Sequence, residues 1–127
     1  MSENNNVENL EQEEKQITEQ EIKDTVESLR DYLPKLHDGL LYIVEKYRGG
    51  QNGEAHKSLV DATEGINWVI DVISILFPDK IDFPSVNAVL RNLVDGIENQ
   101  DTQNIADVIE HEVLELVVNW QQIFNAK

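Results

Sequence analysis

Residues 101–124 read DTQNIADVIEHEVLELVVNWQQIF, without a proline or a glycine. Large apolar residues recur along this stretch at steps of three and four, the spacing that puts side chains on one face of an α-helix. The members of that face are Ile105, Ile109, Val113, Leu116, Trp120 and Ile123. We therefore expect one helix, capped by Asp101, whose apolar face forms a wall of the core.

A long helix is expected near the amino end. Thr18 and Glu21 have the spacing of a capping box, in which each side chain binds the backbone amide of the other. An unbroken apolar stripe follows: Ile22, Val26, Leu29, Leu33, Leu36, Leu40, Ile43 and Tyr47. Pro34 falls inside this stripe. Because the stripe keeps its phase across the proline, we expect one kinked helix rather than two helices at a wide angle.

Two further helices are expected between these ends. Three glycines among residues 48–53 indicate a loop, and a segment bracketed by Pro78 and Pro84 indicates a second break. The helix over 54–77 would bury Leu59, Ala62, Ile66, Val69, Ile73 and Leu76, and the helix over 85–98 would bury Val86, Leu90, Leu93 and Ile97. Short connections make successive helices antiparallel neighbours. The predicted fold is all-α: an antiparallel up-down bundle of four main helices, the first long and kinked at Pro34.

Domain organisation follows from the distribution of apolar residues. Residues 17–127 are expected to form a single helical bundle domain. Residues 1–16 contain only Val7 and Leu10 as large apolar residues after the first methionine, within a run of Glu, Asn and Gln. Such a segment buries too little to offset its ordering entropy. We interpret it as a disordered acidic leader.

Composition restricts the partners. The 127 residues carry 25 acidic and 10 basic side chains, a net charge of −15. This field repels nucleic-acid phosphates and anionic lipid headgroups and attracts cationic surfaces. There is no cysteine, no secretory signal pattern and no apolar run near the ~20 residues that cross a bilayer. We expect a cytoplasmic protein that binds neither nucleic acid nor membrane.

Catalytic motifs are missing from the sequence. It contains no phosphate-binding loop with its lysine, no nucleophile elbow and no Glu-x-x-His pair of the di-iron type. Asp107, His111 and Glu115 share one helix face at i, i+4 and i+8, which makes them candidate metal ligands. They point away from the apolar stripe, so a solvated helix face is the simpler interpretation. The sequence therefore predicts no enzyme activity and no cofactor.

Four apolar residues fall outside the expected core stripes: Trp68, Ile75, Leu114 and Val118. In one interpretation, a neighbouring segment, either the 77–83 loop or the leader, covers Trp68. Alternatively, these residues form a patch that a protein partner buries, with Glu64, Asp71, Asp107 and Glu115 steering a basic amphipathic segment toward it. Homodimerisation would use the same atoms. The leading hypothesis is a non-enzymatic adaptor or chaperone-like module; a homodimeric structural protein and a metal-binding bundle are the alternatives.

One segment carries a resemblance. IADVIEHEVL at 105–114, followed by Trp120, is similar to an Ala-Asp-Leu-Leu-Glu-Tyr-Glu-Leu…Trp pattern in small uncharacterised helical proteins of Gram-positive bacteria. His111 replaces the aromatic residue of that pattern. The resemblance covers about twenty residues and implies a helical fold without a defined activity. In size and charge the expected bundle also resembles the small cytoplasmic chaperones of flagellar and type III export.

Overall fold

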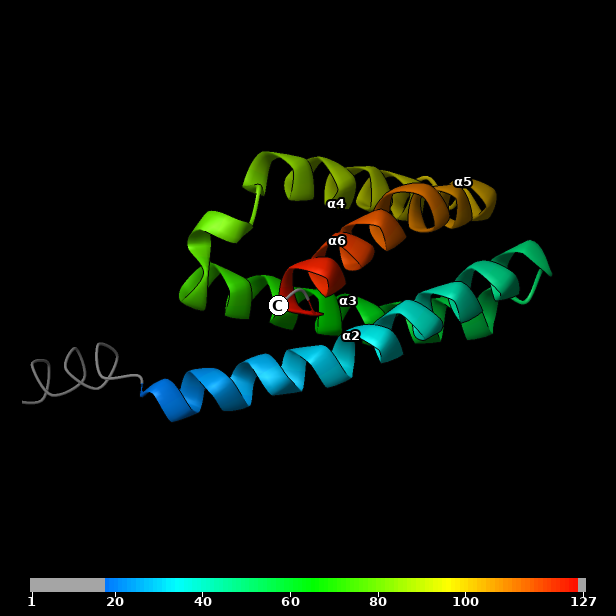
Figure 1. Ribbon diagram of the computed structural model, residues 1–127. Helices are drawn as coiled ribbons and strands as arrows, with labels where there is room; N and C mark the ends of the chain where they lie inside the picture. The colour runs from blue at the N-terminus through cyan, green and yellow to red at the C-terminus, as the bar shows by residue number, and fades with distance from the viewer. Residues whose placement is uncertain (1–17, 126–127) are drawn as a thin grey trace, which may run out of the picture.

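The computed structural model describes residues 18–125, and these form a bundle of antiparallel helices (Figure 1). In chain order the elements are α2 (Glu19–Arg48), α3 (Asn52–Leu76), the 3₁₀ turn η1 (Pro78–Lys80), α4 (Phe83–Glu98), α5 (Thr102–Val108), the π-helical turn η2 (Ile109–Val113) and α6 (Leu114–Asn125). α5, η2 and α6 follow one another as a single helical rod. The described part of the chain therefore has the predicted four main helices. The predicted leader, residues 1–16, lies outside the described residues.

α2 begins at the predicted cap and passes the proline without a break. The Thr18 hydroxyl accepts a hydrogen bond from the Glu21 amide at 3.0 Å. Pro34 lies inside the helix, which bends in its middle but continues to Arg48 (Figure 1). The predicted stripe is buried from Leu29 to Tyr47, whereas Ile22 and Val26 near the start are only half-buried. The early turns of α2 therefore extend past the packed part of the core.

The breaks after α2 and α3 follow the turn chemistry of the sequence. Gly50 has φ +77°, a conformation that glycine adopts without steric cost, and the chain reverses there into α3. At the second break, Asp82 caps α4 by accepting from the Ser85 amide, with Pro84 in the first turn. Each reversal places consecutive helices antiparallel.

α2 is the element on which the bundle is assembled. It packs against α3 on one side and against α5 and α6 on the other, and α4 packs mainly on α5 and η2. The Arg30 guanidinium donates to the Phe124 carbonyl and so ties α2 to the end of α6. The core lies between these helices and includes Leu40, Ile43, Ile66, Ile73, Ile105, Ile109 and Val117.

The third predicted apolar stripe is covered unevenly. On α4, Val86 and Leu93 are buried, Leu90 is half-buried and Ile97 is exposed, which corrects the prediction for Ile97. The reason is position in the bundle: α4 packs on α5 and η2 and makes few close contacts with α3. Ile97 faces α3 across an open hollow of about 300 Å³ and is therefore not covered. Within residues 18–125, no helix has both the length and the apolar character needed to cross a membrane.

Candidate functional site

The four residues of the predicted apolar patch do not lie on one surface. Trp68 and Ile75 are exposed on α3, with 40% and 68% of their surface accessible, and Val118 is 36% accessible on α6. Leu114 is buried, with 7% accessible, so its assignment to an exposed patch is wrong. Val118 belongs to α6, which packs mainly on α2, and therefore lies on a different helix from Trp68 and Ile75.

The π-helical turn η2 explains the error at Leu114. A π-turn places extra chain in one turn of the helix, so every later residue is rotated relative to a regular α-helix. The buried residues of the last rod are Ile105, Ala106, Val108, Ile109, Val113, Leu114, Val117, Trp120 and Phe124. Leu116 and Ile123, predicted to be core, are only half-buried, and Val117 and Phe124 take their places.

α3 carries a continuous outward stripe, which we call the α3 face. It consists of Val60, Glu64, Trp68, Asp71 and Ile75, spaced by four, four, three and four residues, and all five are exposed. This stripe lies opposite the buried stripe of the same helix. Three apolar and two acidic side chains therefore alternate along one helix surface, and four of the five belong to the predicted binding residues.

A corner of two aromatic rings lies beside the α3 face. Tyr32 of α2 meets Trp68 edge-on, with ring centroids 5.7 Å apart and ring planes at 88°. The tyrosine reaches across α3 at Gly65, where an added Cβ would lie 1.6 Å from the Tyr32 hydroxyl oxygen. Only a glycine allows this approach. Burial of the ring raises the pKa of Tyr32 above its ordinary value.

The corner opens into a hollow of about 450 Å³, lined by Ser28, Tyr32, Asp61, Glu64, Gly65 and Trp68. A second hollow, of about 220 Å³, shares Tyr32 and Asp61 with the first and extends along the same pair of helices past Lys35, Gly39 and Tyr42. We call the two together the α2–α3 groove. Glycines and small side chains form part of its lining, and aromatic rings and carboxylates stand at its sides.

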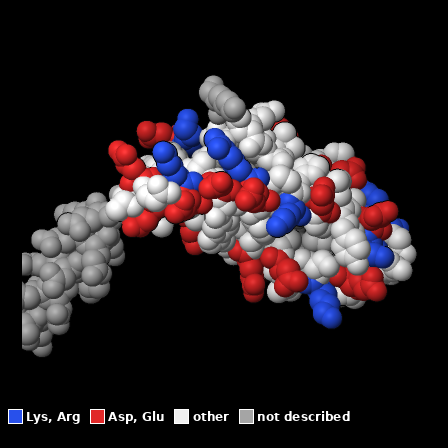
Figure 2. Space-filling view, turned by 60° about the horizontal axis from the view of Figure 1, so that its bottom comes forward, with Lys and Arg blue, Asp and Glu red and all other residues white. Residues whose placement is uncertain are grey.

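The acidic side chains of α3 differ in whether they form ion pairs within the protein. Neither Asp61 nor Glu64 forms an ion pair with any residue in the described range 18–125, whereas Glu54, two to three turns earlier on α3, pairs with Lys46 at 3.5 Å. The view onto α2 and its underside shows acidic and basic side chains scattered between uncharged areas (Figure 2). The carboxylates beside the Tyr32–Trp68 corner thus remain available to a cation from outside.

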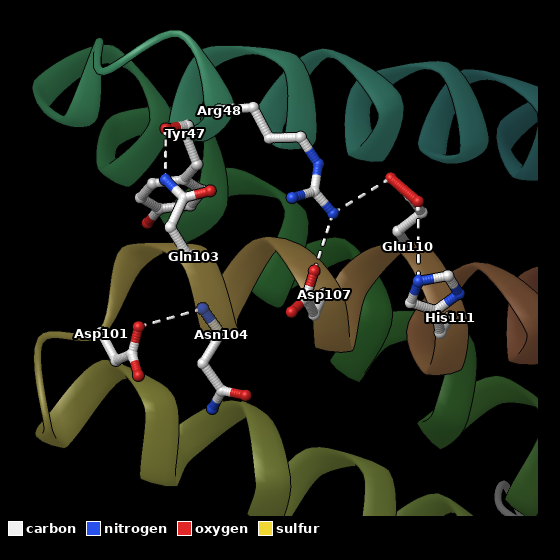
Figure 3. A network of polar contacts seen from close by, with 8 residues as sticks. All are labelled: Tyr47, Arg48, Asp101, Gln103, Asn104, Asp107, Glu110 and His111. Carbon is white, nitrogen blue, oxygen red and sulfur yellow. Dashed lines mark hydrogen bonds and ion pairs between the residues drawn. The ribbon is translucent and has the colours of Figure 1, made fainter.

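The candidate metal ligands lie in a different environment. Arg48, at the end of α2, binds Asp107 at 2.8 Å and Glu110 at 3.3 Å, and His111 lies 3.6 Å from Glu110 (Figure 3). The hydrogen bond to Asp107 raises the pKa of Arg48. No group of three His, Asp or Glu side chains in the described residues is placed to hold a metal ion. Asp107 is thus paired with an arginine, and it is not gathered with His111 and Glu115.

Figure 3 shows what this polar network does instead. It connects the end of α2 to α5 and η2, and the Gln103 amide adds a hydrogen bond to the Tyr47 carbonyl at 3.2 Å. Asp101 caps the start of α5 through the Asn104 amide at 3.1 Å. These contacts fix one end of the bundle, so we assign them a structural role.

A third hollow, of about 510 Å³, lies between η1, α4 and α6 and includes Lys80, Asp82, Ser85 and Trp120 in its lining. Asp82 and Ser85 already bind each other as the cap of α4. Trp120 is buried, as expected from its apolar stripe. Two polar side chains of this hollow are therefore engaged within the protein.

The groove residues that the sequence interpretation missed include Tyr32, Gly39, Tyr42, Asp61 and Gly65. On α2, Tyr32, Lys35, Gly39 and Tyr42 recur at steps of three and four, beside the core stripe. Together with the short loop to α3, that second stripe indicates which flank of α2 faces α3. The close approach of Tyr32 to Gly65 depends on side-chain geometry and has no sequence signal of its own.

The fold and the groove define an all-helical, acidic bundle with an aromatic groove between its first two helices. The chain belongs to the family described as "Domain of unknown function (DUF8042)", whose model matches residues 24–123. That range includes every residue of the α3 face and of the α2–α3 groove. No curated protein and no solved structure matches the chain.

Proposed function

We propose that the protein is a non-enzymatic interaction module that binds a basic amphipathic segment of a protein partner along the α3 face and the α2–α3 groove. The observation that carries this proposal is Trp68: a large aromatic side chain, 40% accessible, held by Tyr32 at the mouth of a hollow that carboxylates flank. Exposed tryptophans in such settings are frequent anchors of protein interfaces. A soluble, chaperone-like role in the cytoplasm of a bacterial cell is part of this proposal.

The dimensions of the α3 face suit a helical partner. From Val60 to Ile75 the stripe extends over about 22 Å, at 1.5 Å per residue. A partner helix laid along it would bury Val60, Trp68 and Ile75 with its apolar side. Lysines or arginines on the edges of that helix would meet Asp61, Glu64 and Asp71. This is the helix-in-groove mode of recognition, with electrostatic steering from the net charge of −15.

The test is a titration with a designed basic amphipathic peptide of roughly 18 residues, built from leucine and lysine, followed by fluorescence anisotropy of a label on the peptide. We expect saturable binding that weakens as salt is added, because exposed charges are screened. The same peptide with glutamate in place of lysine should not bind. If both peptides bind equally, or neither does, the proposal is wrong.

A charge-reversal pair locates the site. The double substitution Asp61→Lys and Glu64→Lys should weaken binding about tenfold, equivalent to about 1.4 kcal/mol. The matched control is Asp95→Lys with Glu98→Lys, which makes the same change of net charge on exposed positions of α4. The control should weaken binding only about twofold, because Asp95 and Glu98 belong neither to the α3 face nor to the lining of the α2–α3 groove. Equal effects of the two pairs would mean that net charge alone attracts the peptide.

A further inference from the structure

The Tyr32–Trp68 corner has a geometry that selects among cations. The two rings are perpendicular and in contact, so a ligand in the hollow meets aromatic surface on two sides. Gly65 lies on α3 between Asp61 and Trp68, which are one turn before it and one turn after it. The Tyr32 ring crosses α3 at that glycine. The carboxylate of Asp61 therefore lies on one side of the Tyr32 ring, and the ring of Trp68 lies on the other.

The carboxylates at this corner have no internal counter-ion in the described chain. Only three acids of the described range pair with a lysine or an arginine: Asp107 and Glu110 with Arg48, and Glu54 with Lys46. Asp61 and Glu64 line the hollow without such a partner among residues 18–125. A cation that enters the hollow would meet the aromatic faces and these carboxylates at the same time, and both attract positive charge.

An arginine side chain fits this combination better than a lysine. The guanidinium group is planar, stacks on aromatic rings, is weakly hydrated and can bind carboxylates through two N–H groups at once. The lysine ammonium is compact and strongly hydrated, so it loses more on leaving water and gains less from a flat ring. From this geometry we infer that the Tyr32–Trp68 corner is an arginine-binding subsite, which makes the protein selective for partner segments that carry arginine rather than lysine. This inference rests on the proposed function.

The test compares two amphipathic peptides of the same length, apolar pattern and net charge, one with arginine and one with lysine at every basic position. We expect the arginine peptide to bind wild-type protein at least about tenfold more tightly. In Trp68→Leu this preference should fall to about twofold or less, because the aromatic face that favours guanidinium is lost. The Phe83→Leu variant is the matched control, since Phe83 is an exposed aromatic residue outside the α3 face and the α2–α3 groove, and it should keep the preference.

A second readout locates the cation directly. Titration with N-acetylarginine amide should shift the indole NH resonance of Trp68 in a two-dimensional ¹⁵N spectrum and leave that of the buried Trp120 in place. N-acetyllysine amide and tetramethylammonium should give smaller shifts at the same concentration. Equal affinity for the two peptides, or an arginine preference that survives in Trp68→Leu, would overturn the subsite while leaving the proposed function standing. Failure of both peptides to bind would overturn both.

Discussion

Gly65 and Gly39 lie in the middle of helices and provide a direct test of the corner. An alanine Cβ at position 65 would lie 1.6 Å from the Tyr32 hydroxyl oxygen and 2.7 Å from its Cζ, whereas a Cβ at position 39 would meet nothing within 4 Å. Gly→Ala in a helix interior normally stabilises a protein by about 0.5–1 kcal/mol. We therefore expect Gly39→Ala to raise the free energy of unfolding by about that amount.

Gly65→Ala should not show this gain. The tyrosine ring must swing away from α3, which loses its edge contact with Trp68, worth about 0.5–1.5 kcal/mol, together with part of the ring's burial. The two effects offset each other, so the expected change in the free energy of unfolding lies between about zero and a loss of 1 kcal/mol. The same displacement opens the corner, and the arginine preference of the proposed subsite should fall with it.

A double-mutant cycle isolates the contact. In a Tyr32→Ala background nothing remains for the new Cβ to displace, so Gly65→Ala should regain the full stabilisation of about 0.5–1 kcal/mol. The assay is urea unfolding followed by far-UV circular dichroism, with unchanged m-values as the check that the denatured state is the same. If Gly65→Ala stabilises the wild-type protein as much as Gly39→Ala does, Tyr32 does not lie across α3 and the account of the corner is wrong.

Three further predictions concern the core, the exposed surface and the buried tyrosines. Trp68→Asp should abolish peptide binding and cost about 0.5–1.5 kcal/mol through loss of the Tyr32 contact. Trp120→Ala should cost about 3–5 kcal/mol, because Trp120 is buried; equal losses in thermal denaturation would show that Trp68 is a core residue. Leu114→Ala should lower the free energy of unfolding by about 2–5 kcal/mol and Val118→Ala by less than about 1 kcal/mol, as measured from urea midpoints. Equal losses would mean that the two residues are equally exposed, as expected for a regular α-helix without the η2 turn. Burial raises the pKa of both Tyr32 and Tyr47, so the unfolded chain loses these protons at a lower pH than the folded protein does. The stability of the protein should therefore be intact below about pH 10 and fall as the pH rises above it. Urea midpoints from about pH 9 to 11 should decline less in Tyr47→Phe than in the wild type, and an identical decline would contradict the raised pKa of Tyr47.

The sequence predicted the helices well because their signals are local. Thr18 caps α2 and Asp101 caps α5 as their positions indicate, and Gly50 adopts the conformation that a loop of glycines allows. The continuity of α2 through Pro34 also followed from the sequence, since the stripe on both sides of the proline keeps one phase and packs on the same core.

The errors arose where tertiary packing decides. The interpretation of Leu114 assumed 100° per residue along the last helix, and the η2 turn changes that angle. The buried residues Ile105, Ile109, Val113 and Val117 recur at four-residue steps, which is longer than a straight α-helix supports and is a sign of the π-turn. Ile97 is exposed because an open hollow separates it from α3, and no local pattern reports that gap.

The sequence predicted the part of the candidate site that lies on a single helix and missed the part that depends on packing between helices. Glu64, Trp68, Asp71 and Ile75 lie on one helix, so their periodicity was enough to place them on one face. Val118 lies on a different helix, and only the packing of α6 on α2 separates it from them. Tyr32 enters the site from α2 through a close contact with Gly65, which requires coordinates.

The central claim is that the α3 face and the α2–α3 groove are where a basic amphipathic segment binds. Its most direct test is a map of ¹⁵N backbone and indole resonances during titration with the arginine peptide. Our account predicts that the largest shifts fall on Tyr32, Asp61, Glu64, Trp68 and Ile75, with α4 and α6 nearly unaffected. Shifts that centre on α4 or α6 while the Trp68 indole resonance stays in place would contradict it.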